Sequence, residues 1–263
     1  MNAPMQAEHA GKEFTGEHDS VKVDAASTDS PIVTCDANGT PTGSAQDAGI
    51  QNDTATDAGA QDASSSAERV VRHEWEQFQL TNNEGGRAAC QGNWPVFHQM
   101  RLSQFLTWNA PLLNSYAHDL DEADEQGRNL ITEKYGRMMA STVPEDFHRN
   151  IEPYIPRLSD VRITAQEQVI GTQVAWADDF RSRYPKLGMA MRVLRTSQDT
   201  ESVTSFETYL RGELGTYSEQ TFRLYETFVA KLHASGRNLT QETIRNTVLL
   251  GGFHDLEEAE ALQ

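Results

Sequence analysis

Helical periodicity is clearest between residues 216 and 232, which read Thr216-Tyr-Ser-Glu-Gln-Thr-Phe-Arg-Leu-Tyr-Glu-Thr-Phe-Val-Ala-Lys-Leu232. The first four residues form a capping-box pattern, in which Thr216 and Glu219 would satisfy the free backbone amides at a helix start. Large apolar side chains then recur at the spacing of one helical face, at Phe222, Tyr225, Val229 and Leu232. We therefore predict a helix here, and we expect it to end at Gly236.

The same spacing of apolar residues recurs through most of the chain from about residue 67 onward. Residues 144–160 carry three prolines and are expected to be irregular, and an Asp255–Glu258 pattern is expected to cap a short final helix. No alternation typical of strands is present in this region, so the predicted fold is all-α. The other predicted helices cover about 67–80, Pro95 to the residues before Pro111, Leu112–Met139 with a break at Gly127, 164–182, 202–212 and 240–250.

Charge and aromatic content divide the 263 residues into two parts. Residues 1–68 hold 12 acidic and 2 basic side chains and only 1 of the 21 aromatic residues. The remaining residues hold 27 acidic and 20 basic groups, so more than half of the net charge of −17 comes from the first part. A segment so poor in aromatic residues cannot bury enough surface to fold. We predict a disordered acidic tail over 1–67, rich in Ala, Asp, Ser and Thr, and a single helical domain over 68–263.

The overall acidity argues against a broad nucleic-acid surface and against binding to an anionic membrane. The longest run without a charged residue, Leu102 to Ala117, has 16 residues, whereas a membrane-spanning helix needs about 20. No signal peptide is legible, and the two cysteines, Cys35 and Cys90, form no metal motif or disulfide framework. A cytoplasmic location is the resulting expectation.

One short polar segment, Asn82-Asn-Glu-Gly-Gly-Arg87, interrupts the aromatic-rich sequence between Phe78 and Trp94. Gly85 and Gly86 allow a tight turn and a close approach to a ligand. Asn83, Glu84, Arg87 and Gln91 supply opposite charges and amides, so this segment is a candidate binding loop. The alternative interpretation is that Glu84 and Arg87 pair with each other or hold neighbouring helices together.

Arginine is the natural partner of carboxylate or phosphate groups, and residues 69–117 have a local net charge of +1 in this acidic chain. We therefore expect Arg87, Arg101 and Arg128 to line a pocket for a small anionic molecule, together with Tyr209 and Arg211. Glu76 or Glu84 is the candidate acid/base group should the site be catalytic. The rival hypothesis is a protein-interaction module in which the same polar residues are a buried network that pins helices.

Several longer strings resemble a bacterial family that is known only as a domain of unknown function, DUF4125. The resemblance covers roughly residues 68–263. It implies a compact domain of this length, without an established reaction or catalytic residues. The strings are Glu74-Trp-Glu-Gln-Phe-Gln79, Asn83-Glu-Gly-Gly-Arg-Ala-Ala-Cys-Gln91, Arg101-Leu-Ser-Gln104, Gly127-Arg-Asn-Leu130, Glu133-Lys-Tyr-Gly-Arg-Met-Met139 and Thr204-Ser-Phe-Glu-Thr-Tyr-Leu-Arg-Gly-Glu-Leu-Gly-Thr-Tyr-Ser218.

Histidines occur in patterns that only partly match known metal sites, and no metal is predicted. In His73-Glu74-x-x-Gln77 a glutamine replaces the second histidine of the zinc-protease motif, and an amide is a poor zinc ligand. The chain also lacks dinucleotide-binding, Walker A and nucleophile-elbow motifs, so no cofactor is predicted. The other histidines and acids considered as ligands were His98, His118, Asp119 and His148.

The tetrapeptide Gly-Arg-Asn-Leu occurs twice, at 127–130 and 236–239, and the two copies are 109 positions apart. Tyr116 and Tyr209 precede the two copies by unequal distances. On that comparison the sequence indicates no duplication, and both copies are interpreted as helix junctions.

Overall fold

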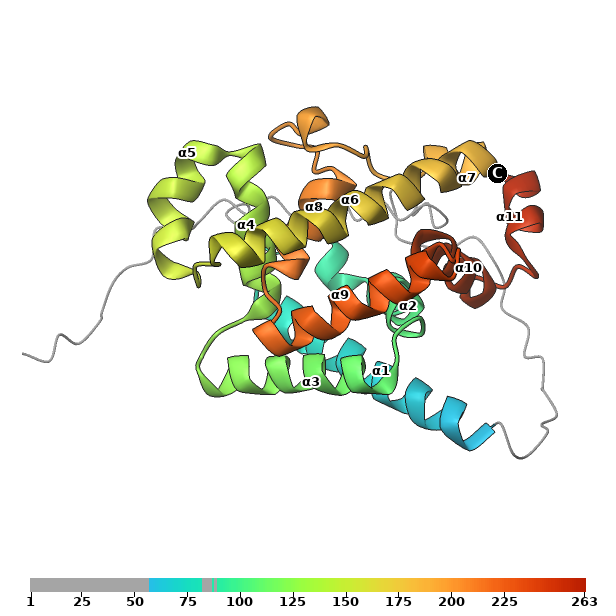
Figure 1. The fold of residues 1–263 in the computed structure, drawn as a ribbon, viewed down its shortest axis with the longest axis horizontal. Coiled ribbons are helices and arrows are strands. Elements are labelled where there is room, and N and C mark those ends of the chain that lie inside the picture. Colours follow the sequence, from blue (N-terminus) through green and yellow to red (C-terminus); the bar gives the residue numbers. More distant parts are fainter. Residues whose placement is uncertain (1–56, 82–86, 88) are drawn as a thin grey trace, which may run out of the picture.

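The structure, a computed structural model, describes residues 57–81, 87 and 89–263. The described residues form eleven α-helices joined by short turns and loops (Figure 1). An isolated bridge between Thr200 and Val203 is the one β interaction among the described residues, so the predicted all-α fold is confirmed. The helices are α1 (Asp57–Gln79), α2 (Trp94–Phe105), α3 (Ala110–Glu125), α4 (Leu130–Thr142), α5 (Pro144–Asp146), α6 (Asp160–Arg183), α7 (Pro185–Met189), α8 (Phe206–Leu214), α9 (Glu219–Ala234), α10 (Leu239–Leu250) and α11 (Leu256–Leu262).

Helix boundaries depart from the sequence predictions at several places. Helix α1 begins at Asp57, within the segment predicted as tail, and residues 1–56 lie outside the described part of the chain. The region 144–160 contains α5, a π turn (Phe147–Ile151) and a 3₁₀ turn (Glu152–Tyr154), so it is short-turn helical rather than irregular.

The N-cap of α9 is Ser218 rather than the predicted Thr216, because the Ser218 hydroxyl accepts a hydrogen bond from the Thr221 amide at 3.2 Å. The predicted cap of the last helix is confirmed, since Asp255 accepts from the Glu258 amide at 2.8 Å.

Both Gly-Arg-Asn-Leu segments form the same helix junction. Gly127 and Gly236 have φ values of 68° and 70°, which L side chains rarely adopt, and each follows the C-cap of a helix. The asparagines then cap the next helices, because Asn129 accepts from the Thr132 amide at 2.8 Å and Asn238 accepts from the Gln241 amide at 3.0 Å. The prediction that both copies are helix junctions is confirmed.

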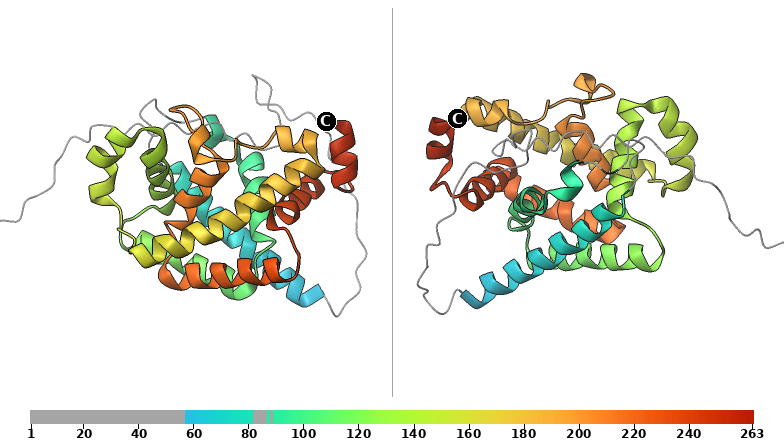
Figure 2. Two further views of the ribbon diagram at one scale, coloured as in Figure 1. Left: turned by 45° about the horizontal axis from the view of Figure 1, so that its top comes forward. Right: turned by 180° about the vertical axis from the view of Figure 1, so that it is seen from behind.

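The two junctions belong to two related four-helix units. The first unit comprises α1, α2, α3 and α4, and the second comprises α6, α8, α9 and α10. Within each unit, the long first helix contacts the other three helices. Between units, α4 packs on α8 as α10 packs on α2, and α3 packs on α9 (Figures 1 and 2). These reciprocal contacts indicate that the two units are related by an approximate two-fold axis, which passes between α3 and α9.

Matching hydrogen bonds align the two units residue by residue. The Tyr116 hydroxyl donates to Glu74 on α1, and the Tyr225 hydroxyl donates to Gln173 on α6. The side-chain amides of Asn129 and Asn238 likewise donate to backbone carbonyls of α1 and α6. The earlier interpretation that there is no duplication is therefore wrong.

The structural counterpart of Tyr116 is Tyr225 and not Tyr209. Tyr225 lies 109 positions after Tyr116, and Gly236 lies 109 positions after Gly127. The tyrosine pair and the glycine pair therefore have the same separation.

Aromatic and aliphatic side chains from both units fill one large core, in which Phe105, Trp108, Tyr116, Tyr217 and Tyr225 contact one another. A smaller apolar cluster joins α6, α7, α10 and α11 around Phe180 and Val248. Polar side chains that interrupt the large core are therefore the features that need a chemical explanation.

Candidate functional site

Charged residues occupy the buried face of several helices near the middle of the domain. On α4, Lys134 lies between the buried residues Ile131 and Met138 and is itself 3% exposed. On α8, Glu213 follows the buried Leu210 by three positions and is also 3% exposed. In the sequence, such residues can be recognised as charges within an otherwise apolar helical face.

Arg101 of α2 is the centre of this cluster. Its guanidinium forms a bidentate pair with Glu74 of α1, with distances of 2.5 Å from Nε and 2.6 Å from Nη2. The other face of the guanidinium reaches both carboxylate oxygens of Glu213 at 3.2 and 3.3 Å, and Nη1 also donates to Gln104 at 2.7 Å. All five N–H donors of Arg101 therefore have acceptors within the protein.

The two carboxylates are held by several further donors. Tyr116 donates to Glu74 at 2.8 Å, and Gln104 donates to Glu213 at 2.7 Å. Burial would raise the pKa of Glu213, but the adjacent Arg101 and Lys134 cations outweigh burial and hold it well below its ordinary value. We call Glu74, Arg101, Lys134 and Glu213 the central ion network. It contains two cations and two anions.

Lys134 differs from Arg101 in the number of donors it uses. Its ammonium donates to the Tyr209 hydroxyl oxygen at 2.8 Å and to Glu213 at 3.3 Å. Burial would lower the pKa of Lys134, but the Tyr209 oxygen and the Glu213 carboxylate raise it above its ordinary value, so the amine is charged at neutral pH. An ammonium has three donors, so one remains for a further acceptor. The Tyr209 hydroxyl also has its own proton to donate.

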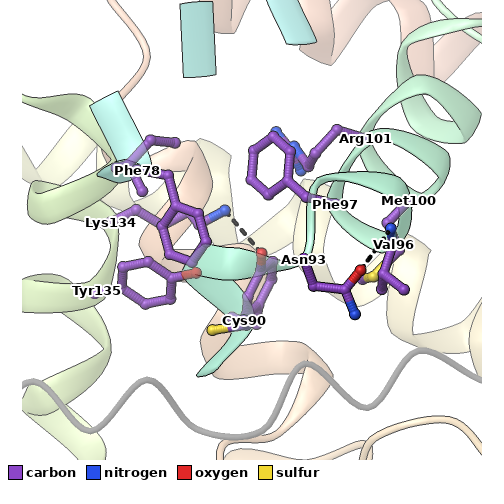
Figure 3. Close-up of a pocket in the computed structure, with 11 residues that line it drawn as sticks. Phe78, Cys90, Asn93, Val96, Phe97, Met100, Arg101, Lys134 and Tyr135 are labelled. Carbon is purple, nitrogen blue, oxygen red and sulfur yellow. Dashed lines mark hydrogen bonds between the residues drawn. The ribbon is translucent and has the colours of Figure 1, made fainter. Parts of the chain in front are cut away.

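Lys134, Tyr209 and Arg101 contribute polar groups to the wall of a cavity of about 30 Å³. Figure 3 shows the side chains that enclose it, which come from α1, α2, α4, α8 and the 3₁₀ turn Ala89–Gly92. The rest of the wall is mainly apolar, and it includes a stacked pair of rings, Phe78 and Phe97, 5.4 Å apart. The remaining lining residues are Cys90, Asn93, Val96, Met100, Ile131 and Tyr135.

Each residue of the ion network has a neutral residue at the corresponding position of the other unit. Glu74 corresponds to Gln173 through the matching tyrosine hydrogen bonds. Along the 109-residue offset, Arg101 corresponds to Leu210, Lys134 to Thr243 and Glu213 to Gln104. Three of the four charges thus belong to the first unit and the fourth, Glu213, belongs to the second.

The predicted binding loop lies mostly outside the described residues, which exclude Asn83, Glu84, Gly85 and Gly86. The two flanking candidates are described. Gln91 is buried, and its amide donates to the Phe78 and Thr81 carbonyls at 2.7 and 2.8 Å, so it caps the end of α1. Arg87 is exposed and donates to the Gln91 carbonyl at 2.9 Å and to the Gln79 side chain.

Of the four arginines expected to share a pocket, which are Arg87, Arg101, Arg128 and Arg211, Arg101 alone lines the cavity. Arg128 lies at the α3–α4 junction and forms a bidentate pair with Glu133 at 2.8 and 2.9 Å. Arg211 forms a bidentate pair with Glu167 of α6 at 2.6 and 2.8 Å and does not line the cavity.

Among the other predicted site residues, Tyr209 is brought to the cavity wall, whereas Glu76 is exposed on α1 and does not line it. Lys134 and Glu74 were not predicted as site residues.

The histidines named in the sequence lie apart, and three of them pair with separate carboxylates. His73 contacts Asp124 at 2.6 Å, and His98 contacts Glu68 at 2.8 Å. Asp119 accepts from the Ser218 amide at 2.9 Å, whereas the neighbouring His118 is exposed. His148 pairs with Glu152 on the exposed surface. Within the described ranges, no group of three or more His, Cys, Asp or Glu side chains is arranged to hold a metal ion.

Cys90 lines the cavity as a free thiol. Burial raises the pKa of this thiol above its ordinary value, so the neutral form is favoured. A neutral thiol is a weak nucleophile, and Cys90 thus contributes to the wall of the cavity rather than an activated thiolate.

These features define a class of helical domain that consists of two related four-helix units with a buried ion network to which both units contribute. The sequence model of a family described as a protein of unknown function, DUF4125, matches residues 65–261. The chain therefore belongs to the DUF4125 family, as the resemblance in the sequence indicated. No curated protein and no solved structure shows significant similarity to it.

Among the helices that the structure describes, none is both long enough and apolar enough to cross a membrane.

Proposed function

We propose that this domain binds a small anionic ligand in the cavity between the Phe78–Phe97 ring pair and the Lys134–Tyr209 pair. The ligand would accept hydrogen bonds from the third donor of Lys134 and from the Tyr209 hydroxyl. The Glu74–Arg101–Glu213 part of the ion network would orient the Glu213 carboxylate that holds the Lys134 ammonium. Because Arg101 has no donor left, it would act on the ligand through its charge and its position.

The observation that carries this proposal is the difference between the two units. Removing two ions from water is expensive, and well-packed apolar residues often replace a buried ion pair without loss of stability. The second unit reaches the same arrangement with Leu210 and Thr243 where the first unit has Arg101 and Lys134. The four-helix arrangement itself therefore does not require these charges, which favours a role in binding over the rival role of pinning helices.

The cavity supports binding more directly than it supports catalysis. Among its polar groups, Lys134 and Tyr209 are hydrogen-bond donors, and its thiol, Cys90, is neutral. Glu76, one of the two candidate acid/base groups, is exposed and lies outside the cavity wall. We accordingly propose a ligand-binding domain and assign no reaction to it.

The test is a thermal-shift measurement on the full chain with sodium acetate and sodium phosphate at constant ionic strength. We expect at least one of the two anions to raise the melting temperature of the wild type. Lys134→Thr, which introduces the residue of the second unit, should abolish the increase because the cavity loses its only ammonium group.

Lys231→Thr is the matched control, since Lys231 is exposed on α9 and the substitution removes the same charge. It should keep the full increase. An equal increase in both lysine variants would mean that the anions act through general screening, and the proposed site would then be wrong.

A further inference from the structure

We infer that the ligand of this cavity is a short-chain monocarboxylate rather than a phosphate-bearing molecule. The inference rests on the proposed function and narrows the class of anion. Three properties of the cavity lead to it, namely its size, the charge of its wall and the apolar character of its lining.

The size of the cavity limits the ligand to a few heavy atoms. A buried water needs a cavity volume of about 10–15 Å³. The volume of this cavity, about 30 Å³, therefore corresponds to roughly two or three water-sized groups. A carboxylate with one or two carbon atoms attached is of this size. A tetrahedral phosphate carries four oxygens around its centre and would leave no space for the group to which it is esterified.

The charge of the wall favours a single negative charge. The central ion network has no net charge, and the one donor of Lys134 that remains can pair with one anionic oxygen. A monocarboxylate adds one charge and offers two acceptor oxygens, one for Lys134 and one for the Tyr209 hydroxyl. A phosphate near neutral pH carries between one and two charges, and a second buried charge would have no partner.

The lining accounts for the remainder of the ligand. Phe78, Phe97, Ile131 and Val96 present apolar atoms to the cavity, and they cannot donate to the further oxygens of a phosphate. The same side chains can bury the methyl or methylene groups of a short acid. Each buried CH₂ group strengthens apolar binding several-fold in an ordinary site, so propanoate should bind more tightly than formate.

The experiment is isothermal titration calorimetry of the full chain with formate, acetate, propanoate, inorganic phosphate and acetamide. We expect one propanoate per chain, with formate and phosphate binding at least tenfold more weakly. Acetamide, which has the shape of acetate without its charge, should also bind at least tenfold more weakly than acetate.

Two variants locate the site. Lys134→Thr should weaken propanoate binding at least tenfold, and Tyr209→Phe, which removes one hydroxyl and keeps the ring, should weaken it several-fold. Circular dichroism of each variant checks that its helices remain. Should Lys134→Thr fail to fold, Tyr209→Phe still tests the site, because unchanged propanoate affinity in this variant would overturn the inference.

The two proposals fail in different ways. Phosphate binding that is tighter than propanoate binding, and that depends on Lys134, would overturn the monocarboxylate inference and leave the anion site in place. The absence of binding by every anion in the series would overturn both proposals.

Discussion

At the scale of single residues, the central feature is a set of charges that is buried and compensated. Arg101 is 6% exposed, yet each of its donors has an acceptor, and Glu213 receives donors from α2, α4 and the start of the α8–α9 connection. Such a network is costly to break on one side only, because the partner that remains is a buried charge without compensation.

The ionisation of Glu213 gives a prediction for stability against pH. Its pKa in the folded state lies well below the ordinary value of 4.5, so its contribution is fully present above about pH 4.5 and is lost as the pH falls further. The Glu213→Gln variant has no titrating group at this position, so it does not lose stability through protonation there. The free energy of unfolding of the variant should fall less steeply between pH 4.5 and 3, by up to about 1.4 kcal/mol per pH unit.

Urea denaturation at several pH values measures this slope. Glu201→Gln, at an exposed position, is the control and should retain the slope of the wild type. Equal slopes for Glu213→Gln and the wild type would contradict the assignment of an ionised, buried Glu213.

At the scale of elements, the Gly-Arg-Asn-Leu junction occurs twice with the same structure. The glycine ends one helix with a positive φ, the asparagine caps the next helix, and the leucine is buried at 2% exposure in one copy and 5% in the other. In both copies the arginine pairs with a glutamate five positions later, Glu133 or Glu242. A short sequence thereby fixes the turn between two consecutive helices.

The two junction glycines should be sensitive to substitution for the same reason. A Cβ at Gly127 or Gly236 would meet no atom within 4 Å, so the cost of alanine arises from the left-handed backbone alone. We expect each substitution to lower the free energy of unfolding by about 1–2 kcal/mol, as measured by urea denaturation.

Gly171→Ala is the matched control, because Gly171 also has open space around it but lies inside α6. Alanine there should raise the free energy of unfolding by about 0.5–1 kcal/mol. A similar effect at all three glycines would contradict the role assigned to the positive φ.

Sequence periodicity was sufficient to predict the longer helices because they bury apolar residues on one face, as α9 buries Phe222 and Val229. It was insufficient for the site. Arg101 was identified as a candidate, but its partners Glu74 and Glu213 are 27 and 112 positions away, and only the packing of α1, α2 and α8 brings them together.

At the scale of the whole molecule, the domain is a pair of related units that exchange contacts. Helix α4 of the first unit packs on α8 of the second, and α10 of the second packs on α2 of the first. Each unit therefore supplies part of the surroundings of the other. This is also why the cavity of the first unit uses Tyr209 from the second.

The duplication was present in the sequence, but it was hidden because the two copies share few residues. Gly-Arg-Asn-Leu is repeated in full, whereas most core positions differ in size or polarity, as Trp108 and Tyr217 do. Equivalence became visible through hydrogen bonds, such as those from Tyr116 to Glu74 and from Tyr225 to Gln173, which require both position and chemistry to match.

The central claim is that the charges of the central ion network serve a ligand and are not needed to hold the fold. The most direct test replaces each of its four residues by the neutral counterpart from the other unit, through Glu74→Gln, Arg101→Leu, Lys134→Thr and Glu213→Gln in one chain. The measurement is the free energy of unfolding in urea. We predict a value equal to that of the wild type or higher by about 1–4 kcal/mol, because no charge is left buried without a partner. A decrease of about 3–5 kcal/mol, or a failure to fold, would contradict the claim and assign the network to the stability of the fold.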